Sequence, residues 1–319
     1  MPSVMAPKIL SFARVPENGG DTDVPDAAQS ELLQCPWVVP EDPLEAEWEA
    51  VRRTIDAREL AQLEELRCVV QERGLDKHKA CIGEGAAPHS QKAATLLRFL
   101  RARSGDCEAA AWLLEEALDW RADFDIDRKI REWRSEWAEG ISPRVRVLQK
   151  YTFMAPLGLD LEGLPAVAIR HSVSDLGGLC REIGMETMLV YMAAMIEDQF
   201  ERAHERMMER GHCLTNFIEV WDLYHALSPA GLGAVPFYKK YASVFDKVYP
   251  ERLRVCFIIR VPWAWNTVWR FFEAIMPAAT KKKIRIKGCR ADSWLEEFRA
   301  LLPDESIPDW LRSDSAALA

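Results

Sequence analysis

The sequence lacks the residue spacings of disulfide frameworks and of metal sites. Its eight cysteines are scattered over 319 residues without a C-x-x-C pair, and its six histidines form no H-E-x-x-H motif. A chain of this length folds without disulfides, so reduced thiols are the expected state of these cysteines in the cytoplasm. We expect no bound metal and no disulfide framework.

Long apolar runs are also absent. No stretch approaches the ~20 apolar residues that a membrane-spanning helix needs, and the N-terminus has no apolar signal-peptide core. The chain also has no G-x-S-x-G elbow, no phosphate-binding loop and no motif that places a nucleophile beside a base. The sequence therefore predicts a cytoplasmic protein that is not an enzyme.

A broad basic face is the third missing feature. The net charge of −9 and the pI near 5.4 argue against a nucleic-acid partner, because binding many phosphates requires an extended positive surface. Basic character is confined to one cluster, formed by residues 281–283 with Arg285, Lys287 and Arg290. This cluster is either a solvated face or a binding site for one phosphate. The second alternative is possible because Thr280 and Lys283 share one side of a helical turn.

The distribution of apolar residues divides the chain into four parts. Residues 1–43 are rich in Pro, Gly, Asp and Glu and predict a disordered acidic tail, whereas residues 44–140 carry helical periodicity. Strand and helix patterns alternate over residues 141–312, and residues 313–319 form a flexible C-terminus. The alternation predicts an α/β fold, in which a mixed sheet carries flanking helices beside a separate helical N-terminal lobe.

Individual elements follow from the same patterns. Gly177 and Gly178 should open a loop before a long helix over residues 186–210, and Asp106 is placed to cap a helix of the lobe. A short helix over residues 293–302 should close the domain. We expect strands at residues 166–171, 215–223, 254–261 and 283–287.

Large apolar side chains line one side of a helix expected over residues 265–276. Arg270 and Glu273 lie on the opposite side. The pattern fits either a helix buried against the sheet or one that covers an apolar cavity and swings toward a bilayer, where Trp and Phe partition well. The apolar side chains are Trp265, Val268, Trp269, Phe272 and Met276.

Several blocks of sequence together resemble the CRAL-TRIO lipid-binding family, in its phosphatidylinositol/phosphatidylcholine transfer protein branch. The blocks are Leu96-Leu97-Arg98-Phe99-Leu100-Arg101-Ala102-Arg103, Tyr249-Pro250-Glu251-Arg252-Leu253, Phe257-Ile258-Ile259, residues 280–283 and Ile307-Pro308-Asp309-Trp310-Leu311. The resemblance implies a CRAL-TRIO fold, with a helical lobe and a mixed sheet that forms the floor of an apolar lipid pocket. It also implies that the helix over residues 265–276 is the gate of that pocket.

The resemblance further implies a cytosolic protein that binds phosphatidylinositol and exchanges or presents it during transient contact with a membrane surface. Thr280 and Lys283 would hold the lipid phosphate, Glu251 would accept hydrogen bonds from inositol hydroxyls, and Arg103 would brace the site from the helical lobe. The bound phospholipid is the ligand, and no other cofactor is expected.

Some positions depart from the family pattern. Ser104 stands where close relatives have a basic residue, and Arg260 stands where Asn is common. Phosphatidylcholine-binding members carry hydroxyl side chains at positions that here are Val167, Phe217 and Glu219, so the resemblance implies that phosphatidylcholine binding is lost.

Glu219 also lies on one expected sheet with two arginines, Arg170 and Arg260. A buried carboxylate is costly unless it is paired. One hypothesis is that Glu219 pairs with an arginine inside the pocket and selects a second ligand with a polar end. The alternative is that these charges lie at strand ends in water.

Two other functions remain open. The chain could carry a different hydrophobic molecule, such as a sterol, a tocopherol or a retinoid, with its basic cluster against anionic membrane lipids. It could also be a lipid-regulated adaptor whose acidic tail recruits a partner such as a lipid kinase.

Overall fold

The computed structural model describes residues 39–78, 89–139, 142–151, 154–170, 175–224, 235–261, 269–270, 273 and 278–313. The predicted acidic tail therefore lies outside the described residues up to position 38, and the first helix begins at Pro43.

Four helices of the N-terminal lobe enclose a core of their own. Asp42, Asp56 and Asp106 each accept a backbone N–H bond at the start of a helix, which confirms the cap predicted at Asp106. Trp48, Leu63 and Leu96 are among the buried side chains of this core. The helices are α1 (Pro43–Arg52), α2 (Ala57–Glu72), α3 (Ala93–Ala102) and α4 (Cys107–Phe124), with short 3-10 turns η2 (Leu75–Lys77) and η4 (His89–Gln91).

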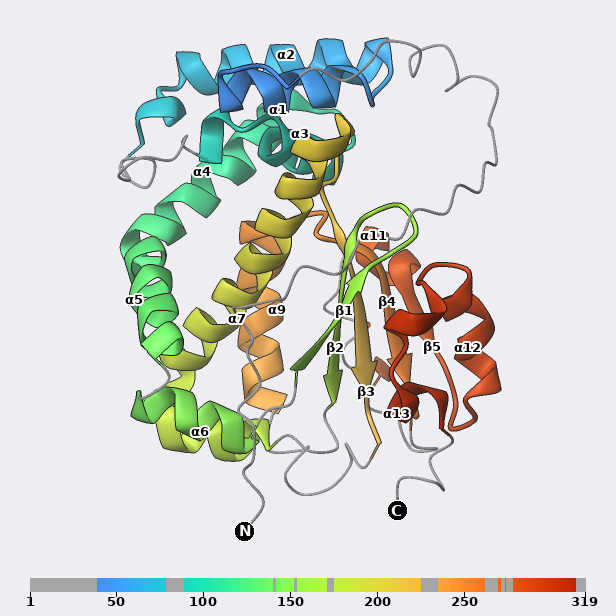
Figure 1. Ribbon diagram of the computed structural model, residues 1–319. Helices are drawn as coiled ribbons and strands as arrows, with labels where there is room; N and C mark the ends of the chain where they lie inside the picture. Colours follow the sequence, from blue (N-terminus) through green and yellow to red (C-terminus); the bar gives the residue numbers. More distant parts are fainter. Residues whose placement is uncertain are drawn as a thin grey trace.

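Two further helices lead from the lobe to the sheet. Asp125 adopts a left-handed backbone conformation, with φ of 53°, and ends α4. Helix α5 (Ile126–Glu139) then buries Ile130 and Trp133, and α6 (Pro143–Tyr151) follows. Figure 1 shows α5 running down the side of the molecule away from the sheet and α6 lying across its lower end.

The sheet has five strands in the order β1-β2-β3-β4-β5. The pair β1–β2 is antiparallel and the three other pairs are parallel, so the sheet is mixed, as predicted. Four strands match expected positions, whereas β1 was not expected. The strands are β1 (Met154–Leu159), β2 (Pro165–Arg170), β3 (Phe217–Asp222), β4 (Leu253–Ile259) and β5 (Ile284–Ile286).

The expected loop at Gly177 and Gly178 is wrong. Both glycines lie in the first turn of α7 (Leu176–Arg210), because the Asp175 side chain accepts the Gly178 N–H at 2.6 Å and caps the helix. Gly184, with φ of 84°, interrupts the helical conformation shortly before the expected start at residue 186.

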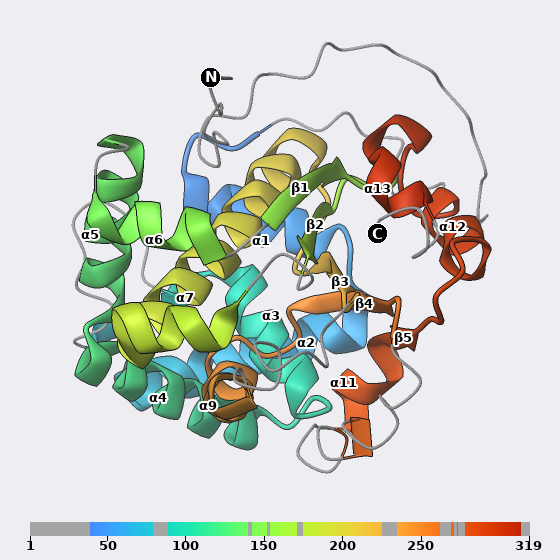
Figure 2. The same ribbon diagram turned by 90° about the horizontal axis from the view of Figure 1, so that it is seen from below.

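Helices cover both faces of the sheet (Figures 1 and 2). On one face, α7 and α9 (Val235–Val248) pack against Val167, Phe217 and Ile258. We call this the ligand face. Ile218 and Phe257 point to the opposite face, as the alternation of a strand requires. That face is covered by α12 (Asp292–Arg299), η6 (Asp304–Ser306) and α13 (Asp309–Arg312), while α11 (Ala278–Lys283) leads into β5.

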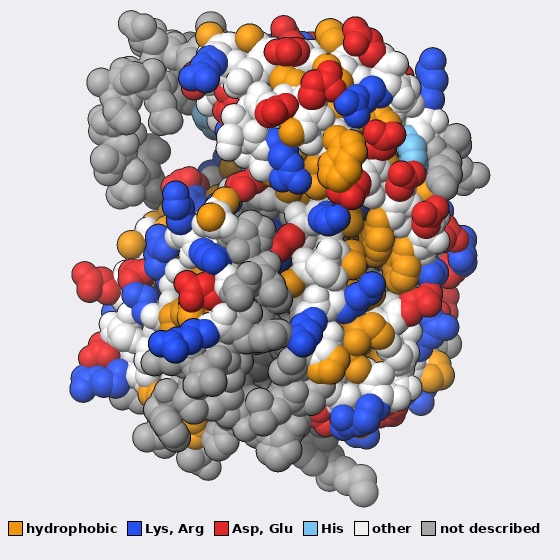
Figure 3. All heavy atoms as spheres, turned by 180° about the vertical axis from the view of Figure 1, so that it is seen from behind, with side chains coloured by type: hydrophobic (Ala, Val, Ile, Leu, Met, Phe, Trp, Pro, Cys, Tyr) orange, Lys and Arg blue, Asp and Glu red, His pale blue; other side chains and the backbone are white. Residues whose placement is uncertain are grey.

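Within the described ranges, no helix is long and apolar enough to cross a membrane. On the face shown in Figure 3, basic and acidic side chains are interspersed.

Candidate functional site

Lys283 and Glu251 meet beside the sheet. Lys283 is the last residue of α11, and Glu251 lies in the turn between α9 and β4 with a left-handed φ of 54°. The Lys283 ammonium donates to the Glu251 carboxylate at 2.5 Å, and each side chain keeps about a quarter of its surface exposed. The structure thus joins two predicted headgroup residues that are far apart in the sequence.

Thr280 lies one helical turn before Lys283 on α11. Residues three positions apart share one side of a helix, so the Thr280 hydroxyl and the Lys283 ammonium point to the same region. Both side chains are partly buried. A hydroxyl donor and an ammonium donor on one side can bind a single anionic group.

Arg103 follows the end of α3, and Ser104 next to it adopts a left-handed φ of 54°. The Arg103 guanidinium donates to the Ala102 carbonyl at 3.1 Å. Among the described residues it makes no ion pair with Glu251. The bracing role predicted for Arg103 therefore remains a prediction.

Arg101, two residues before Arg103, pairs with Glu59 of α2. Hydrogen bonds of 2.6 and 2.9 Å to Glu59 are the main cause that raises the Arg101 pKa, and attraction to Glu251 adds a smaller effect.

Four of the five apolar gate residues, Trp265, Val268, Phe272 and Met276, lie outside the described residues. Trp269 is described, is partly buried and packs against the core of the ligand face, whereas Arg270 and Glu273 are exposed. Trp269 thus faces the core while Arg270 and Glu273 face solvent, as expected for the helix over residues 265–276. The gating role itself stays a prediction.

Phe217 and Glu219 lie on the ligand face of β3 and are almost fully buried. Phe217 packs edge to face against Phe200 of α7, with ring centroids 5.7 Å apart. In register, Glu219 lies between Val167 of β2 and Cys256 of β4. A carboxylate is therefore placed within an otherwise apolar row of the sheet.

Glu219 does approach an arginine, but the candidates named from the sequence were wrong. Its Oε1 atom lies 4.0 Å from Nε of Arg252, and its Oε2 atom accepts the Trp221 indole N–H at 2.9 Å. Burial raises the pKa of Glu219, against the attraction of Arg252.

Arg170 and Arg260 interact with Asp222 instead. Asp222 is three residues after Glu219 and points to the opposite face, where Arg260 Nη1 lies 2.8 Å and Arg170 Nε 3.7 Å from its carboxylate. The alternation of side chains along β3 thus separates Glu219 from both expected partners.

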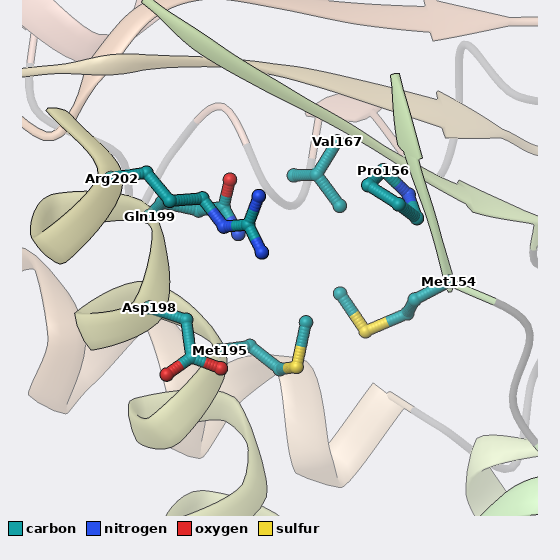
Figure 4. Close-up of a pocket in the computed structure, with 7 residues that line it drawn as sticks. All are labelled: Met154, Pro156, Val167, Met195, Asp198, Gln199 and Arg202. Atoms are coloured by element: carbon teal, nitrogen blue, oxygen red, sulfur yellow. The ribbon is translucent and has the colours of Figure 1, made fainter. Parts of the chain in front are cut away.

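A small pocket lies between α7 and the β1–β2 pair (Figure 4). Gln199 and Arg202 extend from α7 toward Val167 and Pro156 across it, and the thioethers of Met154 and Met195 form its other side. The free space between these side chains is small, with room for about one water molecule.

Asp198 also lines this pocket. Burial is the main cause that raises the pKa of Asp198 from 3.8 to about 6, although Arg134 pairs with its carboxylate at 2.7 Å. Among the residues described, no group of three or more His, Cys, Asp or Glu side chains is arranged to hold a metal ion.

Known proteins similar to this chain share one domain. The profile of the CRAL/TRIO domain matches residues 150–311. A CRAL-TRIO domain-containing protein of Caenorhabditis elegans is 27% identical over 84% of this chain and 35% of its own length. "Protein real-time" of Aedes aegypti is 27% identical over 72% of this chain and 34% of its own length. The chain therefore spans about a third of the length of these two relatives.

A shorter relative matches over most of its length. "Sec14 cytosolic factor" of Schizosaccharomyces pombe is 25% identical over 67% of this chain and 72% of its own length. Among solved structures, the "Crystal structure of Sfh5" matches with a TM-score of 0.49 and 15% identity, over 76% of this chain and 84% of that one. Because the domain profile matches just over half of the sequence, and the mixed sheet with its helical lobe agrees with the expected fold, this chain belongs to the CRAL/TRIO domain family.

Proposed function

We propose that this protein binds phosphatidylinositol in a gated apolar pocket and exchanges or presents it at membrane surfaces without covalent chemistry. Membership of the CRAL/TRIO family supports lipid binding. The observation that carries the choice of lipid is the 2.5 Å contact between Lys283 and Glu251, with Thr280 one turn away. The proposed lipid-binding domain covers residues 141–312, and residues 44–140 form the lobe.

The three side chains offer complementary chemistry for a phosphoinositide headgroup. Lys283 and Thr280 would donate to the phosphate, with charge-assisted bonds contributing ~1.5–3 kcal/mol each. Glu251 would accept from inositol hydroxyls. Glu251 neutralises Lys283, so a bound phosphate would share the ammonium that Glu251 holds in place. Arg103 would support the site from the end of α3.

The ligand face supports the placement of the acyl chains. Its core contains buried aliphatic and aromatic side chains from β2, β3, β4, α7 and α9, and Trp269 of the proposed gate packs against it. Each methylene group transferred from water to such surroundings contributes ~0.8 kcal/mol. Release would require the gate to open at a membrane.

The test is to identify the lipid that copurifies with the full chain, by native mass spectrometry and lipid extraction, and to measure transfer of labelled phosphatidylinositol between vesicles. We expect phosphatidylinositol to be recovered and transferred, and phosphatidylcholine to be absent. Recovery of no phosphatidylinositol, together with no transfer, would overturn the proposal.

A second candidate is a carrier of another hydrophobic molecule, such as a sterol, a tocopherol or a retinoid. It is favoured by the buried Glu219 and Arg252 side chains on the ligand face, which a phosphoinositide headgroup at Lys283 does not use. The basic cluster would then contact anionic membrane lipids. Lys281 and Lys282 suit that role, since neither forms an ion pair within the described part of the chain.

The name of the Schizosaccharomyces pombe relative supports a cytosolic location, with transient membrane contact. A regulatory role would instead depend on residues 1–43 and on a partner such as a lipid kinase. A pull-down that required these residues but not the pocket ligand would favour this adaptor function over lipid transfer.

A further inference from the structure

A small cavity lies where helices α3 and α4 of the lobe meet α7 and α9. Arg98 of α3 and Arg121 of α4 line it, together with Glu197 of α7 and Tyr249 directly after α9. Its remaining walls are mostly apolar, Leu114 of α4 among them. The free space has room for about one water molecule or one ion of similar size.

Arg98 is a buried cation that forms no ion pair with the described residues. Only 8% of its surface is exposed. Arg121, the other arginine of the cavity, is shared by Glu197 and Asp127. Burial is the main cause that lowers the pKa of Arg98 to about 10, and attraction to Glu197 and Glu47 does not offset it. The charge of Arg98 is therefore removed from water without being neutralised.

Arg98 and Thr95 have hydrogen-bond donors that are not used. Nη2 of Arg98 donates at 3.2 Å to the hydroxyl of Thr95, one turn earlier on α3. Nε of Arg98 is buried and has no hydrogen-bond partner, and Nη1 makes no hydrogen bond to the described residues. The Thr95 oxygen accepts from Arg98, so its own proton can be donated elsewhere. Two neighbouring side chains thus lack acceptors for several N–H and O–H groups.

Phe200 of α7 holds the guanidinium in place. Cζ of Arg98 lies 3.8 Å from the centroid of the Phe200 ring, which itself packs edge to face against Phe217. The ring attracts the cation, but it carries no localised oxygen or nitrogen acceptor. The contact therefore positions Arg98 and leaves its unpaired charge beside the cavity.

A small monovalent anion is the ligand that matches these groups. It accepts hydrogen bonds from N–H and O–H groups and neutralises the cation. A water molecule would fill the space and accept hydrogen bonds, but it would leave the charge of Arg98 uncompensated. A cation would be repelled, and a phosphate group is too large for the space. Chloride has the required charge and a size close to that of a water molecule.

We propose that Thr95 and Arg98 bind one chloride ion in the cavity between the lobe and α7. The ion would accept the Thr95 O–H and the unused N–H groups of Arg98. Glu197, the carboxylate of the cavity, already pairs with Arg121 at 2.8 Å, which reduces its repulsion of the ion. Because the cavity is lined from both sides, the bound ion would stabilise the contact of the lobe with α7 and α9. The inference does not depend on which lipid the protein carries.

The first test is the effect of chloride on stability. Urea denaturation of the full chain is measured in sodium gluconate, and then with ~200 mM of the gluconate replaced by chloride at constant ionic strength. Gluconate serves as the reference because it is too large for the cavity. We expect the unfolding equilibrium constant to fall ~10-fold in chloride, as for a ligand present at about ten times its Kd.

Chloride NMR detects the ion directly. Exchange between the solution and a protein site broadens the signal of chloride, so the linewidth should increase in the presence of the protein. The linewidth reports binding without reference to unfolding, and it therefore separates a bound ion from a general effect of salt on stability.

Variants assign both effects to the cavity. Arg98→Met removes the buried charge and should abolish the chloride effects. Thr95→Val removes the hydroxyl donor with little change of shape and should weaken chloride binding ~5-fold or more. This variant keeps the arginine, so it decides the question if Arg98→Met does not fold. Arg67→Met is the matched control, because Arg67 also lies over an aromatic ring of the lobe, 4.7 Å from the centroid of Trp48, but is exposed. It should retain both effects.

Equal unfolding in gluconate and in chloride, with no line broadening that Arg98→Met or Thr95→Val reduces, would overturn the inference and would leave ordered water as the occupant of the cavity. Chloride effects that persist unchanged in both variants would also overturn it, because the ion would then bind elsewhere.

Discussion

The hydroxyl of Tyr249 donates a 2.9 Å hydrogen bond to Glu197 of α7, and this carboxylate also accepts a 2.8 Å bond from Arg121 of the helical lobe. Tyr249 stands two residues before Glu251. The network therefore connects the lobe, the long helix α7 and the turn that carries a proposed headgroup residue. Arg121 in turn pairs with Asp127 of α5.

Replacing Arg121 should strongly destabilise the protein. Arg121→Met would leave the Glu197 and Asp127 carboxylates without their shared cation, and breaking a buried pair in this way costs ~3–5 kcal/mol. Urea denaturation followed by tryptophan fluorescence measures the loss. Arg128→Met is the control, because Arg128 is half exposed in its pairs with Asp125 and Glu132 and should cost less than ~1 kcal/mol. Equal effects of the two substitutions would contradict this account.

Asp198 should make stability depend on pH in a defined direction. Because burial raises its pKa from 3.8 to about 6, the folded state binds the proton more tightly than the unfolded state. Between these two values the folded protein holds more protons, so the contribution of Asp198 to the free energy of unfolding increases as the pH falls from about 6 to about 4.

The variant Asp198→Asn isolates this contribution. The difference in unfolding free energy between the original protein and the variant should shift by on the order of 2–3 kcal/mol in favour of the original protein from pH 7 to pH 4. Denaturant titrations at several pH values measure it. A difference that stays constant over this range would show that the Asp198 carboxyl has an ordinary pKa in the folded protein.

The sequence predicted the elements with strong local signals. The third expected strand, rich in Val, Ile and Phe, is β4, and Asp106 caps its helix because the cap depends on adjacent residues alone. The strand β1 was missed since Pro156 and Gly158 are unfavourable in strands. The structure accommodates them with a register shift between these two residues at an edge of the sheet.

The contacts of the candidate site also differ in how far the sequence alone predicts them. That Lys283 and Glu251 belong to one site was predicted from the motifs that carry the family resemblance, although their ion pair was not. The pairing of Glu219 with Arg252 could not be predicted, because it depends on the register that places Glu219 opposite Cys256, the middle residue of β4. Register is set by the whole sheet, and a turn residue such as Arg252 gives no periodic signal.

Lys283→Ala should distinguish the headgroup site from a membrane-binding surface. Loss of one charge-assisted contact to phosphate should weaken phosphatidylinositol binding ~10- to 100-fold. Lys282→Ala is the control, because Lys282 is exposed on the same helix and forms no ion pair with the described residues. Quantification of copurified phosphatidylinositol measures the effect. If Lys283→Ala instead lowers vesicle binding and leaves the profile of copurified lipids unchanged, the basic cluster binds the membrane surface and not the headgroup of the bound lipid.

Arg260 should hold the C-terminal helix on the sheet. It adopts a left-handed backbone conformation with φ of 53°, is fully buried, pairs with Asp222 at 2.8 Å and donates to the carbonyls of Trp310 and Ser313. Arg260→Asn suits the same backbone conformation, because Asn is tolerated there, but its short side chain cannot make these contacts. The substitution therefore removes the contacts of the Arg260 side chain without straining the backbone.

In Arg260→Asn, the Asp222 carboxylate would be left with Arg170 at 3.7 Å, and the carbonyls of Trp310 and Ser313 would lose this donor. We expect a loss of ~3–5 kcal/mol in unfolding free energy. We also expect backbone amides of residues 309–313 to exchange with deuterium ~10-fold faster or more, since this short helix would open locally before the sheet unfolds. Arg290→Ala, at an exposed side chain, should change neither quantity. Unchanged exchange at residues 309–313 in Arg260→Asn would mean that packing of Leu311 and Ile307 holds the segment without the arginine.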